Sequence, residues 1–269
     1  MSEFPSEISS RALASGARTR AAESMPRSSG TWVRAAGQSA AEVLWPTRCI
    51  GCNALGDLLC PGCRLRLPWI DQRWACPDCG APFGYLACAL CDHDWEMRST
   101  ICACTFSGLP ARIATIYKDH HERRLAGVMA AAMACALDEA ASWPAADGRP
   151  RFDPVALDAL CFVPATPTAY ARRGFDHMEL VTRWLSRFLG LPLLDCLVRD
   201  DARDQRGLGR EDREANLADT LGLVEDVRGL RLLLADDVVT TGASLRASAR
   251  ALLDAGAAEV TCCAFARVW

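Results

Sequence analysis

From about residue 100 onward, apolar residues fall into two patterns, short continuous runs and segments with helical spacing. Continuous apolar runs are typical of strands buried on both faces, and spacings of three and four residues are typical of amphipathic helices. The helical pattern predicts helices over 122–143, 178–189 and 244–255. The continuous runs predict strands over 111–117, 159–163, 193–198, 221–224, 230–235 and 260–264. Because strands and helices alternate, we expect a parallel α/β sheet covered by helices on both faces.

The first forty residues have a different composition, rich in Ser, Arg, Ala and Gly and poor in large apolar residues. Such a segment buries too little surface to offset its conformational entropy, so we expect a disordered tail. The next sixty residues are rich in cysteine and turn-forming residues and show little helical periodicity. We therefore divide the chain into a tail over 1–40, a small cysteine-rich domain over 41–99 and an α/β domain over 100–269.

The charge of the chain is nearly balanced, with 30 basic against 33 acidic residues and a net charge of −3. This balance argues against a strongly basic nucleic-acid or membrane-surface binder. The sequence has no apolar run of about eighteen residues and no apolar signal core near its start. We therefore expect a cytoplasmic protein without membrane insertion, in a compartment where thiols stay reduced. The 15 cysteines then require an explanation other than disulfides.

Eight of these cysteines form four Cys-x2-Cys pairs, at Cys49/Cys52, Cys60/Cys63, Cys76/Cys79 and Cys88/Cys91. Each pair presents two thiolates from one tight turn, and a tetrahedral Zn²⁺ ion needs two such pairs. The spacing predicts two closed zinc sites, with structural zinc favoured over an iron–sulfur cluster. Pairing of neighbouring turns is the simplest arrangement, although pairing of the first with the third and the second with the fourth stays open. Because four thiolates leave no open metal position, we expect a role in folding rather than catalysis.

The other seven cysteines lie in or beside apolar runs, and none has a histidine close in sequence. We expect all of them to be buried as small hydrophobic side chains. They are Cys102, Cys104, Cys135, Cys161, Cys196, Cys262 and Cys263.

The most informative segment follows the strand predicted over 230–235. Two adjacent acids end the strand, and a loop of small residues and a predicted helix follow them. Because open parallel sheets bind ligands at this edge, we expect the loop amides and the helix N-terminus to hold a phosphate, and the acids to accept hydrogen bonds from sugar hydroxyls. An ordinary helix cap would explain Thr241 or Ser244, but not the two tandem acids. The predicted ligand-binding segment comprises Asp236, Asp237, Val238, Val239, Thr240, Thr241, Gly242, Ala243 and Ser244.

This segment resembles the phosphoribosyl pyrophosphate (PRPP) signature of type I phosphoribosyltransferases, an apolar strand followed by two acids and a Thr-Thr-Gly phosphate loop. With the four cysteine pairs, further stretches make the chain from about Leu44 onward similar to the ComF family of competence-associated proteins, also called the GntX-like family. These stretches are Ile-Tyr-Lys at 116–118, Phe-Val-Pro at 162–164, Arg-Arg-Gly-Phe-Asp at 172–176, and the series Arg199, Gln205, Arg213 and Asn216. The resemblance implies a type I phosphoribosyltransferase-like sheet flanked by helices and preceded by a double zinc ribbon.

The resemblance also implies roles for individual residues. Asp236 and Asp237 would hold the ribose hydroxyls of PRPP, with Mg²⁺ bridging to the pyrophosphate, and the loop would hold the 5′-phosphate. Arg172 and Arg173 are candidates for the pyrophosphate, because a guanidinium is a forked donor suited to phosphate oxygens. Lys118 is the only lysine of the chain, which indicates that a compact ammonium is needed there. We expect these five residues to act in catalysis, with the polar segment 199–216 closing over the substrate.

Two departures from the family pattern affect the predicted contacts. The Asn-Gln pair that usually follows Arg-Gly-Phe is Asp176-His177 here, and the usual Pro-Val-Pro is Pro164-Ala-Thr. These changes leave the phosphate loop intact but bear on the contacts to the acceptor or the pyrophosphate.

The function implied by the resemblance is transfer of phosphoribose from PRPP to an unidentified acceptor, with a link to competence and DNA uptake. One alternative is a non-catalytic protein that binds PRPP or a nucleotide. The other is an accessory protein of DNA uptake or processing, whose zinc ribbon and phosphate loop meet the uptake machinery or single-stranded DNA. The acceptor and the oligomeric state stay open at the level of sequence.

Overall fold

The computed structural model describes residues 46–91, 95–145, 147–199 and 221–269. The predicted tail over 1–40 and nearly all of the predicted closing segment 199–216 lie outside these residues. Residues Thr47–Trp269 form one compact unit, which contains both the cysteine-rich segment and the sheet. Within the described ranges, no helix is long and apolar enough to cross a membrane.

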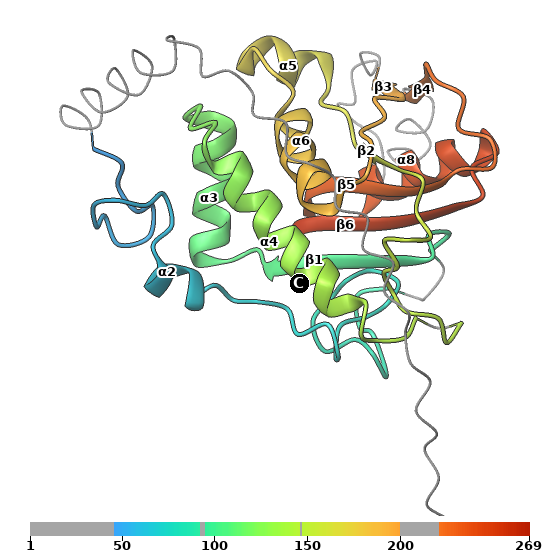
Figure 1. Ribbon diagram of the computed structural model, residues 1–269, viewed down its shortest axis with the longest axis horizontal. Helices are drawn as coiled ribbons and strands as arrows, with labels where there is room; N and C mark the ends of the chain where they lie inside the picture. The colour runs from blue at the N-terminus through green and yellow to red at the C-terminus, as the bar shows by residue number, and fades with distance from the viewer. Residues whose placement is uncertain (1–45, 92–94, 146, 200–220) are drawn as a thin grey trace, which may run out of the picture. The chain divides into compact units, whose positions relative to one another are not determined.

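The central sheet has four strands in the order β1-β6-β5-β2 (Figure 1). All neighbouring pairs are parallel, so the carboxyl ends of the strands meet at one edge. Nearly every strand residue is buried, which explains the continuous apolar runs. The strands are β1 (Ser99–Thr105), β2 (Ala159–Phe162), β5 (Arg231–Val239) and β6 (Glu259–Arg267). The predicted parallel α/β sheet is confirmed, and it includes β1, for which the apolar runs predicted no strand.

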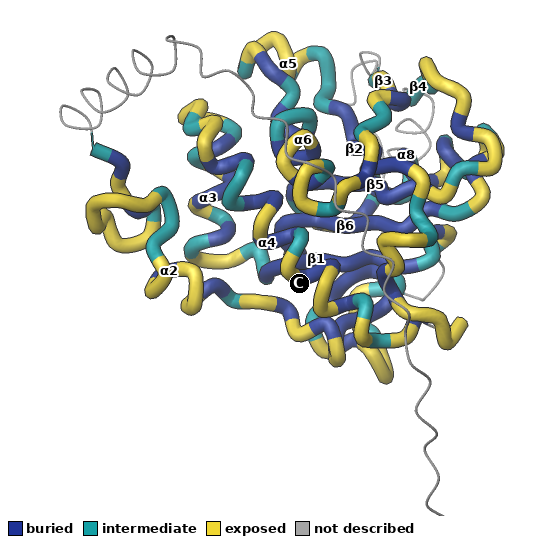
Figure 2. Tube along the Cα trace, viewed as in Figure 1, coloured by how far each residue is buried: buried dark blue, intermediate teal, exposed yellow. Residues whose placement is uncertain are grey.

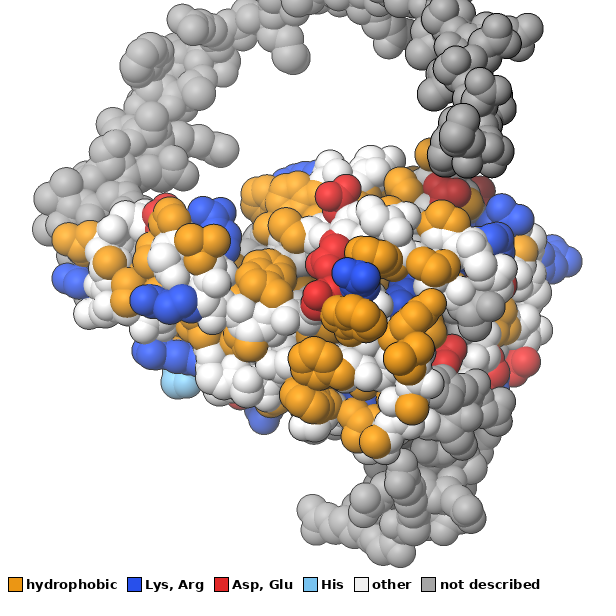
Figure 3. Space-filling view, turned by 90° about the horizontal axis from the view of Figure 1, so that it is seen from below, with side chains coloured by type: hydrophobic (Ala, Val, Ile, Leu, Met, Phe, Trp, Pro, Cys, Tyr) orange, Lys and Arg blue, Asp and Glu red, His pale blue; other side chains and the backbone are white. Residues whose placement is uncertain are grey.

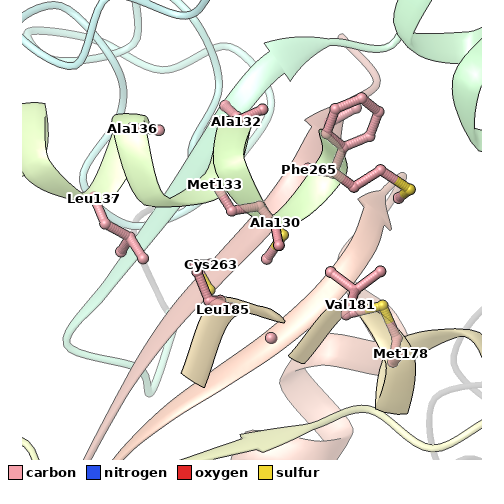
Figure 4. Packing of buried hydrophobic residues seen from close by; sticks show 14 of the residues in the cluster. Ala130, Ala132, Met133, Ala136, Leu137, Met178, Val181, Leu185, Cys263 and Phe265 are labelled. Carbon is pink, nitrogen blue, oxygen red and sulfur yellow. The ribbon is translucent and has the colours of Figure 1, made fainter. Parts of the chain in front are cut away.

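Helices cover both faces of the sheet, as the burial along the chain shows (Figure 2). Helices α4 (Leu125–Ala140) and α6 (His177–Leu189) pack together on one face, and α8 (Ala243–Asp254) packs on the other. Figure 4 shows Ala130 and Met133 of α4 on the side of the helix that faces Val181 and Leu185 of α6 and Cys263 of β6. Small alanines allow the two helices to approach each other and the sheet closely. The predicted helices over 178–189 and 244–255 are confirmed, and the one predicted over 122–143 is shorter at both ends.

The part of the chain that the structure describes has three further helices. Helix α2 (Pro61–Leu65) lies in the cysteine-rich segment, α3 (Gly108–Asp119) follows β1, and α5 (Pro167–Arg173) follows β2. The last two therefore begin at the sheet edge where the carboxyl ends of the strands meet.

The strand predicted over 111–117 is wrong, because these residues belong to α3. The buried residues of this helix include Ile113, Ala114 and Tyr117, which have helical rather than alternating spacing. Pro110 lies in the first turn, where the missing amide proton breaks no helical hydrogen bond. A short apolar segment with two isoleucines fits both patterns, so the pattern alone could not separate them.

The strand predicted over 193–198 is only partly present. Leu193 forms a single bridge to Leu160 of β2, and the chain then leaves the parallel sheet. The strand β3 (Leu197–Arg199) pairs antiparallel with β4 (Leu221–Leu223) in a separate two-stranded sheet. The sequence pattern missed the break because Leu193 and Leu197 both belong to one apolar run.

Six of the seven cysteines outside the Cys-x2-Cys pairs are buried, as predicted. Cys135 is the exception, since it lies on an exposed position of α4. The sequence of that helix is rich in alanine, which is common on both the buried and the exposed side of a helix, so the pattern did not show which side faces solvent. A thiol at 135 is therefore accessible to solvent.

The cysteine-rich segment is joined to the edge of the sheet. The amide of Ile70 donates to the carbonyl of Ala103 at 2.9 Å, and the amide of Thr105 donates to the carbonyl of Pro68 at 2.9 Å. These bonds extend the sheet beyond β1. They tie the cysteine-rich segment to the strands that form the site described next.

Candidate functional site

Strand β5 extends beyond the predicted run and carries both acids before it ends at Val239. Asp236 pairs in register with Ala264 of β6, so the acids are still part of the sheet. Because successive side chains of a strand point to opposite faces, the two carboxylates leave the strand in opposite directions. Gly242, with φ of 83°, ends the loop at the first turn of α8, in a conformation that favours glycine.

A cavity of about 250 Å³ lies at this carboxyl end of β5. Every residue of the predicted ligand-binding segment 236–244 lines it. The opposite wall comes from the segment after β2 and from the start of α6, through residues that include Thr166, Arg173 and His177. Arg199 of β3 lines the cavity as well. Four separate stretches of the chain thus converge on one pocket.

Lys118 and His177 are connected to each other through Asp237, and Arg173 is connected to them through His177. The ammonium of Lys118, in the last turn of α3, forms a close ion pair with Asp237 Oδ2. His177 Nε2 lies 3.1 Å from the same oxygen, and His177 Nδ1 lies 3.3 Å from Nη1 of Arg173. A guanidinium can only donate, so Nδ1 accepts and Nε2 carries the ring proton, beside Oδ2 of Asp237. The tautomer of His177 is thereby fixed.

The positions of Lys118 and His177 are fixed by their neighbours in sequence. The hydroxyl of Tyr117 is buried and donates to the carbonyl of His177 at 2.5 Å. Asp176 caps α6, because its Oδ1 accepts from the amide of Met178 at 2.7 Å. Its Oδ2 accepts from the amide of Ala165, in the segment after β2, at 2.8 Å. Asp176 therefore has a structural role, and it anchors the histidine next to it.

The two acids are held in different protonation states. Burial raises the pKa of Asp237, but the hydrogen bond from His177 and the charge of Lys118 outweigh it, and the pKa lies below its usual range. Burial, reinforced by the neighbouring Asp237 charge, raises the pKa of Asp236 to about 8. Asp237 therefore ionises more readily than Asp236.

Asp236→Asn is expected to flatten the pH dependence of stability. The pKa of Asp236 is about 8 in the folded protein against 3.8 for the ordinary group, so the folded state binds more protons between these values and stability falls as the pH rises through that window. Asn does not titrate, so the variant should exceed wild type by about 2–5 kcal/mol at pH 8 and match it near pH 4. Urea unfolding at several pH values between 4 and 8 measures the free energy of unfolding. The same dependence of this free energy on pH in both proteins would contradict the prediction.

The two predicted arginines occupy different environments. Arg173 lines the cavity, whereas Arg172 does not; its side chain is 67% exposed and lies 3.4 Å from Asp119. Arg199, which the sequence placed in a motif but not in the site, has a buried guanidinium that faces Asp236 and whose pKa is lowered by burial. Among the described residues, its Nε and Nη2 have no hydrogen-bond partner. In the sequence, Arg199 was indicated only as the first residue of the series Arg199, Gln205, Arg213 and Asn216. His177 was indicated only as a departure from the Asn-Gln pair of the family.

The eight paired cysteines form two clusters from neighbouring turns. The first cysteine cluster is Cys49, Cys52, Cys60 and Cys63, and the second is Cys76, Cys79, Cys88 and Cys91. The ligand atoms of each cluster lie within 4.8 Å of one another, so the sequential pairing is the one observed and the interleaved pairing is wrong.

The geometry of both clusters fits a single tetrahedral ion. Sulfur pairs lie 3.6 Å apart at Cys52 and Cys60, and 3.6 Å apart at Cys79 and Cys88. Four sulfurs at 2.3 Å from one zinc ion are about 3.8 Å apart. The amide of Cys60 also donates to the sulfur of Cys49 at 3.4 Å, as is usual around metal-bound thiolates. Each cluster could hold one zinc ion.

Known proteins similar to this chain include a domain family and several curated proteins. Residues 185–268 match the family model of the phosphoribosyl transferase domain. The chain is 32% identical over 115 residues to Competence protein F of Haemophilus influenzae, covering 41% of this chain and 50% of that protein. It is 29% identical over 192 residues to DNA utilization protein YhgH of Salmonella typhi, covering 69% and 80%. It is 34% identical over 105 residues to the YhgH protein of Escherichia coli K12, covering 38% and 46%.

A hypoxanthine phosphoribosyl transferase from Trypanosoma cruzi aligns with the structure at a TM-score of 0.30 and 12% identity, over 53% of this chain and 62% of that one. The family match, the parallel sheet and the pocket after β5 define the chain as phosphoribosyltransferase-like. Together with its relatives, they support a ComF-like protein. The matched stretch spans only about half the length of the Haemophilus and Escherichia coli relatives.

Proposed function

We propose that this protein binds PRPP together with Mg²⁺ and transfers its phosphoribosyl group to an acceptor. The observation that carries the proposal is the pocket itself, in which the acid pair, the small-residue loop and two buried or half-buried arginines line one cavity. PRPP has a ribose diol, a 5′-phosphate and a pyrophosphate. The pocket offers a matching type of group for each of them.

The 5′-phosphate is assigned to the phosphate loop, residues 240–244. This loop combines small side chains, two threonine hydroxyls and the N-terminus of the twelve-residue helix α8. Helix N-termini and successive loop amides bind anions. The ribose hydroxyls are assigned to the adjacent acids, of which Asp237 is held ionised and therefore accepts hydrogen bonds.

The pyrophosphate is assigned to Arg173 and Arg199. In the reaction, the bond between C1 of the ribose and the pyrophosphate oxygen breaks, and its electron pair leaves with the pyrophosphate. A lone pair of the acceptor forms the new bond to C1, and the acceptor loses a proton. Fixed cationic groups around the leaving group lower the barrier by stabilising charge that develops in the transition state.

Mg²⁺ suits this pocket because carboxylate oxygens are among its preferred ligands. The residues that would hold it, directly or through water, are Asp236 and Asp237, and the ion would neutralise charge on the pyrophosphate. Zn²⁺ in the two cysteine clusters would instead stabilise the fold, because four sulfurs leave no position for a substrate.

A role in DNA uptake or use is proposed from the names of the relatives, Competence protein F and DNA utilization protein YhgH. A second candidate function, contact with single-stranded DNA, is favoured by exposed aromatic side chains in the cysteine-rich segment, among them Trp69, Trp74 and Phe83. Figure 3 shows hydrophobic side chains gathered on the face seen from below. Bases stack on such side chains, and Arg73 already stacks on Trp74 at 4.7 Å.

Isothermal titration with PRPP and Mg²⁺ tests the proposal. Arg173→Ala should weaken PRPP binding about tenfold or more, because a charge-assisted contact to phosphate is lost. Arg172→Ala is the matched control, since the neighbouring side chain is exposed and lies outside the cavity, and it should change the affinity by less than about threefold.

The outcomes separate the candidate functions. A wild-type protein that does not bind PRPP would refute both the transferase and the PRPP-binding alternative. PRPP binding without pyrophosphate release, over a panel of bases and amines, would favour the non-catalytic alternative. Binding of single-stranded DNA that weakens steeply with salt would favour the accessory role.

A further inference from the structure

Arg267, at the end of β6, is a buried arginine that connects two parts of the molecule. It is 2% exposed. Its Nε donates to the carbonyl of Cys79 at 2.9 Å, within the second cysteine cluster. Its Nη1 donates to the carbonyl of Val239 at 3.1 Å and to that of Thr240 at close range, where β5 passes into the phosphate loop. One guanidinium thus bonds to a turn of the cysteine cluster and to the start of the loop.

These bonds fix the direction of the loop amides. In a trans peptide the N–H points opposite to the C=O of the same unit, and none of the described peptides is cis. Because the carbonyls of Val239 and Thr240 point at Arg267, the amides of Thr240 and Thr241 point away from it. Both threonines line the cavity, and backbone amides are the groups that a phosphate would use there.

Trp95 forms a second connection between the same two parts. Its ring packs against the second cysteine cluster and lies so close to Gly242 that a Cβ on this glycine would collide with the ring. Arg246 of α8 stacks over the ring at 5.8 Å, and Glu96 pairs with Arg250 of the same helix. The chain that follows the second cluster is therefore packed against the loop and against the start of α8.

We propose that the second cysteine cluster sets the conformation of the phosphate loop, with Arg267 and Trp95 as the positioning residues. The effect of the loop conformation on ligand binding rests on the function proposed above. The first cysteine cluster has no comparable link in the described residues: Arg66 donates to the sulfur of Cys63 at 3.3 Å, and neither residue lines the cavity. The two clusters, although alike in sequence, would then have different roles.

Hydrogen–deuterium exchange on the metal-loaded full chain, without ligand, tests the proposal directly. Arg267→Lys keeps the charge but loses the forked donor geometry of the guanidinium, and it should speed exchange about tenfold at residues 246–248 of α8, where the amide of Arg246 donates to the loop carbonyl of Gly242 at 2.8 Å. Arg151→Lys is the matched control, because Arg151 is 1% exposed and donates to the carbonyl of Gln72 at 2.6 Å, which ties the cysteine-rich segment to the sheet domain away from the loop. It should leave exchange at residues 246–248 unchanged even if it lowers the melting temperature. Trp95→Ala provides a second variant that should speed exchange in the same residues.

The role of the cluster itself is tested with one cysteine from each site. Cys88→Ser should speed exchange at residues 246–248, whereas Cys52→Ser in the first cluster should not. Equal exchange in wild type and Arg267→Lys, or equal effects of the two cysteine variants, would overturn the proposal. Binding of ribose 5-phosphate should weaken about tenfold in Arg267→Lys and little in Arg151→Lys. If wild type binds neither PRPP nor ribose 5-phosphate, the proposed function fails, while the exchange data still decide whether the cluster positions the loop.

Discussion

Asp237→Asn is expected to abolish PRPP binding at the concentrations that saturate wild type, with a loss of affinity of about a hundredfold or more, and to destabilise the protein by about 3 kcal/mol. The amide removes the charge to which Lys118 and His177 are both bound and leaves the ammonium without a counter-charge in a largely buried site. Removing one partner of such a pair is much more destabilising than replacing both. Titration with PRPP and urea unfolding measure the two effects.

A double-mutant cycle gives the control for this prediction. Lys118→Met combined with Asp237→Asn should be less destabilising than the sum of the single changes, because no unpaired ammonium is left. Asp119→Asn provides the matched variant one residue from Lys118, where the acid pairs with exposed Arg172, and it should change stability by less than about 0.5 kcal/mol. Additive effects of the two site mutations would show that the ion pair contributes nothing.

Loss of one cysteine ligand should have an effect of similar size through metal binding. Cys76→Ser, in the buried part of the second cluster, should lower the bound metal from two ions per chain to one and lower the melting temperature by about 10 °C or more. Cys135→Ser is the matched control, because this thiol is exposed and belongs to neither cluster. It should leave both metal content and stability unchanged, within about 0.5 kcal/mol. Metal analysis by mass spectrometry and thermal unfolding measure the outcome, and full metal content in Cys76→Ser would contradict the assignment.

The parts of the site that could be predicted are those encoded in consecutive residues. The acid pair, the loop after it and the Cys-x2-Cys turns each have a local pattern with a direct chemical meaning. His177 and Arg199 were missed because their roles depend on contacts with residues far away in the chain, and a histidine in place of an amide gave no indication of its partner. The ion pair between Lys118 and Asp237 could not be derived for the same reason, although both residues were singled out.

The errors in the fold have a similar physical origin. Residues 111–117 form a helix because Tyr117 and its buried neighbours pack against other elements, and tertiary packing overrides the preference of isoleucine for strands. The exposed position of Cys135 depends on which side of α4 faces the sheet, and a helix rich in alanine does not reveal that side. The central strands were predicted well because burial on both faces requires continuous apolar residues.

The order of the strands has a consequence for how this pocket can change during evolution. The chain after β5 continues into α8 on one face of the sheet, and the chain after β2 continues into α6 on the other, although β5 and β2 are neighbours. The two connections therefore diverge and leave a crevice between them, whatever side chains they carry. Substitutions along the walls of the crevice would alter which molecule is held there. The location of the crevice would not change, because it depends on the order and the connections of the strands.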